Sequence, residues 1–180
     1  NQIFAAARER GVMVAFEAAV AGGIPIIKAL REGLTANRIE WIAGIINGTT
    51  NFILSEMRSK GSDFATVLKE AQRLGYAETD PTFDIEGVDA GHKVTIMSAI
   101  AFGVPVQFDK AYVEGITALQ AVDIRYAEQL GYRIKLLGIT KRRFDLKTAA
   151  GGAGGIELRV HPTLVPASRL IANVEGAMNA

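Results

Sequence analysis

The sequence predicts an α/β (α+β) domain in which helices pack on a mostly covered mixed β-sheet. Three observations lead to this fold class. The chain has 180 residues, 49% hydrophobic and 22% charged, which is enough to bury a substantial core in one domain. Segments typical of strands and of helices alternate along its length. The segment 88–102 is apolar on nearly every helical face, which indicates a helix buried against other elements.

Helices and apolar strands are expected to alternate in the N-terminal half. Pro25 suits the first turn of a helix, and Gly61 is placed to end one. Asn47 or Thr49 is expected to cap the helix that Gly61 ends, and Ser62 the next helix. The expected elements are a helix to residue 10, a strand over 12–20, a helix over 25–34, a strand over 39–46, helices over 47–61 and 63–75, an acidic loop and a helix over 88–102.

Shorter elements are expected after Pro105. The Gly-rich run 151–155 lacks the G-x-G-x-x-G spacing of a dinucleotide-binding turn, so the segment 141–155 is interpreted as a surface loop. The expected elements are a strand over 111–117, a helix over 122–131, a strand over 133–140, this loop, a strand over 156–165, a helix from residue 168 and a last strand near residue 178.

Composition excludes several classes of function. Twenty basic and nineteen acidic residues leave a net charge of +1 and are scattered, so nucleic acid is not an expected partner. The absence of cysteine excludes disulfides, thiolate zinc sites and cysteine nucleophiles, and is compatible with a reducing cytoplasm, the expected location. The most apolar window, 94–106, is too short to cross a bilayer, so no membrane association is expected. Any catalysis must rest on oxygen and nitrogen groups.

The stretch "GYAETDPTFDIEGVDAGHKVTIMSAIAFG" (75–103) places five carboxylates within a dozen residues, followed by Lys93. Asp89 and Lys93 stand four apart in the first two turns of the expected helix, where a lysine gains nothing from the helix dipole. One interpretation is an ordinary ion pair at a partly exposed helix end. The other is a lysine that faces a cleft, oriented by Asp89, with Glu78 and Asp80 nearby. Acids that converge on a lysine suit a zwitterionic or amine-bearing ligand.

Two further segments have the composition of binding sites. "FEAAVAGGIP" places Glu17 before consecutive glycines, which allow backbone carbonyls to turn toward a cation or ligand. "NGTTNF" joins a strand to a helix, where free N–H groups at the helix N-terminus can hold a carboxylate. The second signal is weak by itself, because every capped helix resembles it.

Together these segments resemble the homoserine dehydrogenase family. The resemblance rests on "FEAAVAGGIPIIKALREGL", "GIINGTTNFILSEM" and the stretch 75–103, and "VHPTLVP" and "LIANVEGAMNA" fit as well. It covers the chain from about Gly11 to Ala180 in order. It implies a region that binds substrate and dimerises, in an oxidoreductase that reduces aspartate 4-semialdehyde to homoserine with NADPH or NADH. That reaction lies on the biosynthetic route to threonine, isoleucine and methionine.

The resemblance also implies roles for individual residues. Lys93 would be the general acid that protonates the carbonyl oxygen, and Glu78 and Asp89 would hold the substrate amino and hydroxyl groups. The remaining positions of the substrate site would be Gly48, Thr49 and Tyr76. A structural sodium ion would be bound by the backbone carbonyls of Glu17, Val20, Gly22 and Ile24.

The chain departs from the family at both ends. The N-terminal Rossmann domain, a second lysine and the segment after Ala180 are missing, so residues 1–180 are interpreted as a fragment that binds cofactor poorly and is inactive alone. Two alternatives keep the fold without the chemistry, namely a dimerisation module and a small-molecule sensor. A sensor would bind its ligand independently of Lys93, whereas the enzyme requires Lys93 and Asp89 for turnover.

Overall fold

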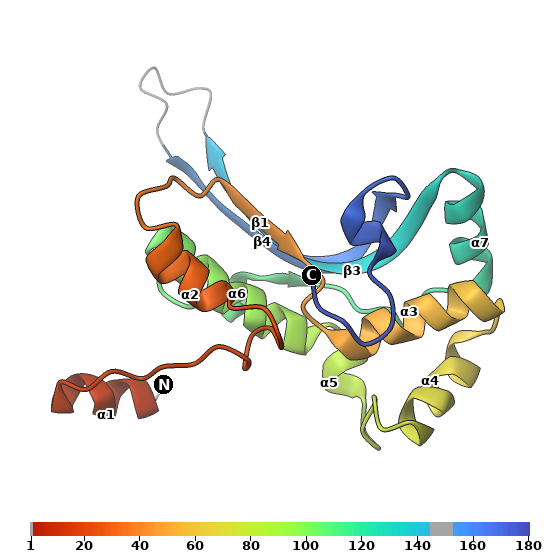
Figure 1. Ribbon diagram of the computed structural model, residues 1–180, viewed down its shortest axis with the longest axis horizontal. Coiled ribbons are helices and arrows are strands. Elements are labelled where there is room, and N and C mark those ends of the chain that lie inside the picture. Colours follow the sequence, from red (N-terminus) through yellow and green to blue (C-terminus); the bar gives the residue numbers. More distant parts are fainter. Residues whose placement is uncertain (1, 145–152) are drawn as a thin grey trace.

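The computed structural model describes residues 2–144 and 153–180 (Figure 1). Within these ranges the strands form a four-stranded sheet in the order β1-β3-β4-β2. Its centre is a long antiparallel pair, β3 (Tyr132–Phe144) and β4 (Ala153–Pro166). β1 (Trp41–Gly44) is antiparallel to β3, and β2 (Tyr112–Val113) is parallel to β4. The predicted mixed sheet is therefore confirmed.

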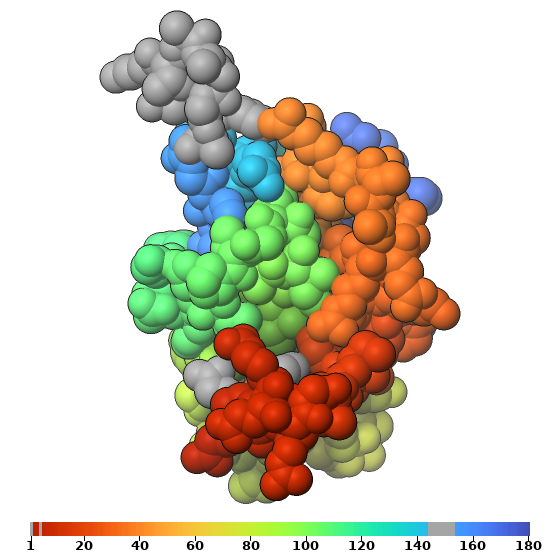
Figure 2. Space-filling view, turned by 90° about the vertical axis from the view of Figure 1, so that its left-hand side faces the viewer, coloured from red at the N-terminus to blue at the C-terminus, as the bar shows by residue number. Residues whose placement is uncertain are grey.

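Helices cover one face of this sheet, with α3 and α6 lying beneath β1 and β3 in Figure 1. The N-terminal segment, in red, lies at the far end of the molecule from the distal ends of β3 and β4 (Figure 2). The α-helices are α1 (Gln2–Arg10), α2 (Ile26–Lys28), α3 (Gly48–Lys60), α4 (Phe64–Arg73), α5 (Thr82–Ile85), α6 (Val88–Phe102) and α7 (Ala121–Gln129). The other helical turns are η1 (Ala29–Gly33), η2 (Phe108–Lys110) and η3 (Leu170–Asn173).

Alternate residues of β3 face two different layers. Leu136 belongs to the larger apolar cluster, formed with α3, α4 and α6, whereas Leu137 belongs to a smaller cluster formed with η3. Gly138 lets α6 approach the sheet closely, because a Cβ there would lie 2.5 Å from Cδ1 of Ile46 and 3.2 Å from Cβ of Val94. As predicted, α6 is buried, with Val94 fully inaccessible.

Helix boundaries follow local capping chemistry. Asn47 caps α3 by accepting a hydrogen bond from the Thr50 amide at 2.9 Å, and Gly61 ends the helix in the left-handed conformation, as predicted. The predicted cap of α4 was wrong by one residue. Asp63, not Ser62, accepts the hydrogen bond from the Thr66 amide. A carboxylate at this position is the stronger acceptor, and its pKa is lowered by the Thr66 hydrogen bonds.

The predicted strand over 12–20 is wrong. Met13 is 87% exposed, and the segment's hydrogen bonds are those of turns, such as the Val20 amide to the Glu17 carbonyl at 2.9 Å. A short apolar run looks the same whether it is a buried strand or an irregular segment, so the pattern alone was not decisive. Other elements are shorter than predicted, since the strand over 111–117 is reduced to β2 and the helix from Ser168 to the turn η3.

Strand pairing extends into the predicted loop 141–155. β3 continues to residue 144 and β4 begins at residue 153, while residues 145–152 lie outside the described ranges. The predicted last strand is reduced to one backbone exchange, in which the Ala180 amide donates to the Ile45 carbonyl at 2.9 Å and the Ile45 amide to the Ala180 carbonyl at 2.6 Å. Among the described helices, none is long and apolar enough to cross a bilayer.

Candidate functional site

The candidate site forms where the first turns of α6 and α3 meet the loop that follows β1. The Lys93 ammonium lies 2.7 Å from Oδ2 of Asp89 and donates to the Ile46 carbonyl at 3.3 Å. Both charged side chains are 22% exposed. Lys93 is therefore partly buried, held by a second chain segment, and still open to solvent. This geometry differs from an ordinary surface ion pair, in which neither side chain is fixed by a third group.

Asn47 connects the acidic residues to α3. Its Nδ2 atom donates to Oδ1 of Asp84 at 2.7 Å and to Oδ2 of Asp89 at 2.9 Å. Its Oδ1 atom accepts from the amide and the hydroxyl of Thr50 at 2.9 and 2.8 Å. The side chain is only 4% exposed, and both amide protons are used. Asn47 thus fixes two carboxylates and a helix start at once.

Asp84 and the bridging role of Asn47 were not predicted from the sequence. Asp84 stands five residues before Asp89, which is not a helical spacing that places two side chains on one face. The chain breaks between them at Gly87 (φ 80°), so that α5 and α6 are separate helices and both carboxylates reach Asn47. The available signal was the glycine between the two acids, which marks a corner where the helix cannot continue.

A neighbouring segment fixes this corner. The Ile116 amide donates to the Ile85 carbonyl at 2.8 Å, and Gly115 packs so closely that a Cβ would lie 2.2 Å from the same carbonyl oxygen. Backbone packing of this kind leaves α5 little freedom relative to α6. The Asp84 carboxylate is therefore placed by the fold rather than by its own rotamers.

Thr49 and Tyr76 lie together beside this cluster. The Thr49 hydroxyl donates to the Tyr76 carbonyl at 2.7 Å, and the Tyr76 ring packs against the ring of Phe52 on α3, with 4.7 Å between the ring centroids and a tilt of 39°. Gly48 begins α3 beneath the C-terminal segment, where a Cβ would lie 2.7 Å from the Ala177 carbonyl oxygen. Gly48 and Thr49 directly follow Asn47 in the chain, and the structure brings Tyr76, which is exposed, next to Thr49.

Glu78 and Asp80 behave differently from Asp84 and Asp89. Glu78 is exposed, and its backbone carbonyl, rather than its carboxylate, accepts a hydrogen bond from Gln72 at 3.1 Å. Asp80 accepts from the amide and the hydroxyl of Thr82 at 3.1 and 2.6 Å, and these hydrogen bonds lower its pKa. In the described residues, neither carboxylate forms an ion pair with Lys93. Asp80 serves the α5 turn, while Glu78 remains free to meet a ligand.

The turn over residues 17–24 starts the helix at α2. The Glu17 carboxylate accepts from the amides of Ile27 and Lys28 at 2.7 and 2.9 Å, and so caps that helix. The Glu17 carbonyl accepts two backbone hydrogen bonds, from the Val20 amide at 2.9 Å and the Ala21 amide at 3.4 Å, whereas the Ile24 carbonyl accepts one, from the Ile26 amide at 2.8 Å. In the described ranges, no three His, Cys, Asp or Glu side chains gather as a metal site.

Comparison with known proteins identifies the family. A family model described as homoserine dehydrogenase matches residues 25–180. The chain belongs to the homoserine dehydrogenase family. A homoserine dehydrogenase of Pseudomonas aeruginosa is 67% identical over 180 residues, which are 100% of this chain and 39% of that relative. The resemblance seen in the sequence is confirmed.

Solved structures of homoserine dehydrogenases share the fold. The crystal structure of a homoserine dehydrogenase from Thiobacillus denitrificans is 74% identical, with a TM-score of 0.90, over 99% of this chain and 39% of that one. A hyperthermophilic archaeal homoserine dehydrogenase mutant, in complex with NADPH, is 28% identical, with a TM-score of 0.73, over 99% of this chain and 48% of that one. The present chain thus spans less than half of each of these relatives.

Proposed function

We propose that this chain is the substrate-binding and catalytic region of a homoserine dehydrogenase. The whole enzyme would reduce L-aspartate 4-semialdehyde to L-homoserine with NADPH or NADH, in the biosynthesis of threonine, isoleucine and methionine. One observation carries the proposal beyond family membership. The Lys93 ammonium is fixed by Asp89 and the Ile46 carbonyl and still has access to solvent. A cytoplasmic location for the enzyme stays a prediction.

Lys93 would act as the general acid. Addition of hydride to the aldehyde carbon moves negative charge onto the carbonyl oxygen, and an ammonium beside that oxygen stabilises the charge and gives it a proton. A positioned proton donor of this kind typically contributes about 10² to 10⁴ in rate. Asp89 would keep the ammonium aimed, and solvent would return the proton. The cofactor, when bound, supplies the hydride.

The carboxylates would recognise the polar groups of the substrate. Glu78 and Asp89 would hold the amino and hydroxyl groups, since Glu78 is exposed two residues after Tyr76 and Asp89 retains Oδ1 for a further hydrogen bond. Asp84, placed by Asn47, would add to the negative field that attracts an ammonium. Gly48, Thr49 and Tyr76 would form the wall next to these carboxylates.

The cofactor would be bound mainly by parts of the enzyme outside these 180 residues. The sequence contains no G-x-G-x-x-G fingerprint, whereas the longer archaeal relative was solved in complex with NADPH. We therefore expect residues 1–180 alone to show no aldehyde-dependent NADPH oxidation. Measurable turnover by the purified 180-residue chain would contradict this assignment of the cofactor site.

The turn over residues 17–24 would bind a sodium ion through the carbonyls of Glu17, Val20, Gly22 and Ile24. Gly23 has a left-handed φ of 76°, a conformation that favours glycine and lets the chain turn at this point. The Glu17 carboxylate would add charge nearby while it caps α2. The ion would be structural, and we expect its exchange for lithium to lower the melting temperature without abolishing activity.

The sheet face opposite α6 would form a homodimer. Register places Trp41 and Tyr112 on this face, where they are 60% and 58% exposed. Exposed aromatic side chains on one face are typical of a subunit interface. Sedimentation of the full-length protein tests this, since Trp41→Asp should shift it toward the monomer.

The test of the catalytic proposal is NADPH oxidation with aspartate semialdehyde by the full-length protein and its Lys93→Ala variant. We expect kcat to fall about 10² to 10⁴-fold, with the fold retained by circular dichroism. Lys69→Ala is the matched control, since Lys69 is an exposed lysine on α4, and it should leave kcat unchanged. If Lys93→Ala retains near-normal turnover, the general-acid role is wrong. If the wild type is silent, the dimerisation or sensor module becomes the better description.

A further inference from the structure

A second polar cluster lies one helical turn further along α3, at Asn51, and holds the C-terminal segment 174–180, which we call the strap. Lys135, on β3, is only 3% exposed, and its Nζ atom donates to the Val174 carbonyl at 2.5 Å and to Oδ1 of Asn51 at 3.0 Å. Asn51, on α3, is 1% exposed. None of these groups contacts Lys93 or its acids, so the proposed chemistry does not account for them.

Asn51 binds the strap backbone at alternate residues. Its Nδ2 atom donates to the carbonyls of Val174 at 3.2 Å, Gly176 at 2.8 Å and Met178 at 3.4 Å. The Lys135 ammonium fixes which end of the amide faces the strap, because it can only donate and so requires the Asn51 oxygen. The pair therefore forms a specific anchor for a segment that has no regular secondary structure.

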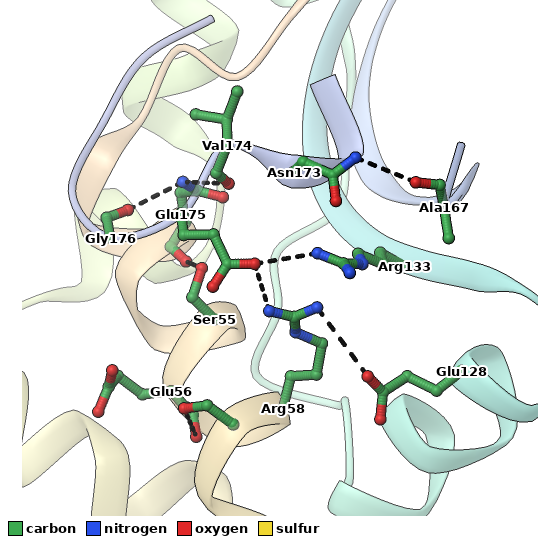
Figure 3. A network of polar contacts seen from close by, with 12 residues as sticks. Ser55, Glu56, Arg58, Glu128, Arg133, Ala167, Asn173, Val174, Glu175 and Gly176 are labelled. Atoms are coloured by element: carbon green, nitrogen blue, oxygen red, sulfur yellow. Dashed lines mark hydrogen bonds and ion pairs between the residues drawn. The ribbon is translucent and has the colours of Figure 1, made fainter. Parts of the chain in front are cut away.

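Charged residues surround the anchor at its solvent side. Figure 3 shows Glu175 of the strap between Arg58 of α3 and Arg133 of β3. Arg133 lies 3.0 Å from the Glu175 carboxylate, Arg58 also contacts it, and Glu128 of α7 lies 4.0 Å from Arg58. These ion pairs are partly exposed and contribute less than the buried anchor.

The strap reaches the candidate site at its far end. Ala180 exchanges backbone hydrogen bonds with Ile45 at 2.9 and 2.6 Å, and the side-chain Nδ2 of Asn179 donates to the Ile45 carbonyl at 3.2 Å. Ala177 lies against Gly48. Ile45 directly precedes Ile46, whose carbonyl accepts from Lys93. The strap thus pairs with the loop that places both the proton donor and Asn47.

We infer that Asn51 and Lys135 are positioning residues that fix the strap and, through it, the loop Ile45–Gly48 on which the Lys93 site is built. They touch neither the acids nor the lysine of that site. Their effect is transmitted by the Ile45–Ala180 pairing and by the packing of Ala177 on Gly48. The kinetic part of this inference rests on the proposed function, whereas the structural part does not.

Amide hydrogen exchange of the full-length protein tests the structural part. Asn51→Asp keeps the acceptor for Lys135 but replaces the donor to the three strap carbonyls, with almost no change in shape. We expect the Ile45 and Ala180 amides to lose about tenfold or more in protection, while amides in the centre of β3 keep theirs. Lys135→Met, which removes the other donor, should loosen the same two amides. Unchanged protection in both variants would overturn the inference.

Thr140→Val is the matched control. Thr140 is fully buried and its hydroxyl donates to Ser98 at 2.9 Å, but it contacts no strap residue. This variant should lower the melting temperature without reducing the hydrogen-exchange protection of the Ile45 amide.

Kinetics of the full-length protein test the second part of the inference. For Asn51→Asp we expect kcat/KM for the semialdehyde to fall about tenfold to a hundredfold at saturating cofactor, a loss that Thr140→Val should not show. Loosened amides with unchanged kinetics would show that the anchor does not position the site. If wild type is inactive, the proposed function fails, and amide exchange at Ile45 and Ala180 still decides whether the anchor holds the strap.

Discussion

Two lysines of this chain, Lys93 and Lys135, differ in their exposure to solvent and in the groups they contact. Lys93 is 22% exposed and has a carboxylate at 2.7 Å, whereas Lys135 is 3% exposed and contacts a carbonyl and an amide oxygen. Burial lowers the pKa of Lys135 to about 8. A paired, accessible ammonium suits proton donation to a ligand, while a buried one with neutral partners suits the fixing of backbone. Under the proposed function, the same residue type would serve catalysis at position 93 and hold the backbone at position 135.

The largest expected effect separates the two lysines by kinetics. Lys93→Met should lower kcat of the full-length enzyme about 10² to 10⁴-fold with little change in exchange at Ile45. Lys135→Met should lower kcat/KM at most about a hundredfold and should reduce the hydrogen-exchange protection of the Ile45 amide. Steady-state kinetics and exchange on the same preparations check both. Equal kinetic losses in the two variants would erase the distinction between them.

Asn47→Ala should cost the most stability. It leaves the Asp84 and Asp89 carboxylates without their shared donor and removes the cap of α3, so we expect a loss of about 2 to 4 kcal/mol in the free energy of unfolding. Urea denaturation measures it. Asp63→Ala removes only the exposed cap of α4 and should cost clearly less. Similar losses in the two variants would contradict the bridging role of Asn47.

Lys135 should make stability depend on alkaline pH. Its pKa is about 8 in the folded chain against an ordinary 10.5, so between these values the unfolded chain binds more protons and the free energy of unfolding rises with pH. Burial is the main cause, Glu175 opposes it, and Arg58 and Arg133 add to it. The gain should reach about 2 to 3 kcal/mol. Urea titrations should show a higher free energy of unfolding at pH 10 than at pH 7.5 in wild type, relative to Lys135→Met. The same pH dependence in both proteins would refute the prediction.

Asp80→Asn should have the smallest effect. The Asp80 carboxylate bonds to Thr82 and not to Lys93, so we expect kcat of the full-length enzyme to change less than about twofold. Its lowered pKa means that its contribution to stability is present above the ordinary value of 3.8 and is lost as pH falls below it. Asp89→Asn, by contrast, should lower kcat strongly. A comparable loss of kcat in both variants would show that Asp80 and Asp89 contribute equally to the electrostatic potential at the site.

Sequence reasoning found the elements whose ends carry capping residues and whose faces are uniformly apolar. α3, between Asn47 and Gly61, and α6 are examples, because both signals are local. The strand over 12–20 failed because its apolar run has no partner strand, and pairing is a property of the whole sheet. Lys93 and Asp89 were visible because they stand one helical turn apart. Asp84 and Asn51 were not, because their partners lie 37 and more than 80 residues away.

The contact between Gly48 and Ala177 limits what mutation can do at the start of α3. A Cβ at residue 48 would lie 2.7 Å from a backbone oxygen, which no side-chain rotation relieves. A randomised library at this codon, selected for growth without threonine and methionine, should return glycine alone. Thr49, whose hydroxyl makes one hydrogen bond at the exposed edge, should return serine as well. Adjacent codons would then differ sharply in tolerance, although both belong to the same turn.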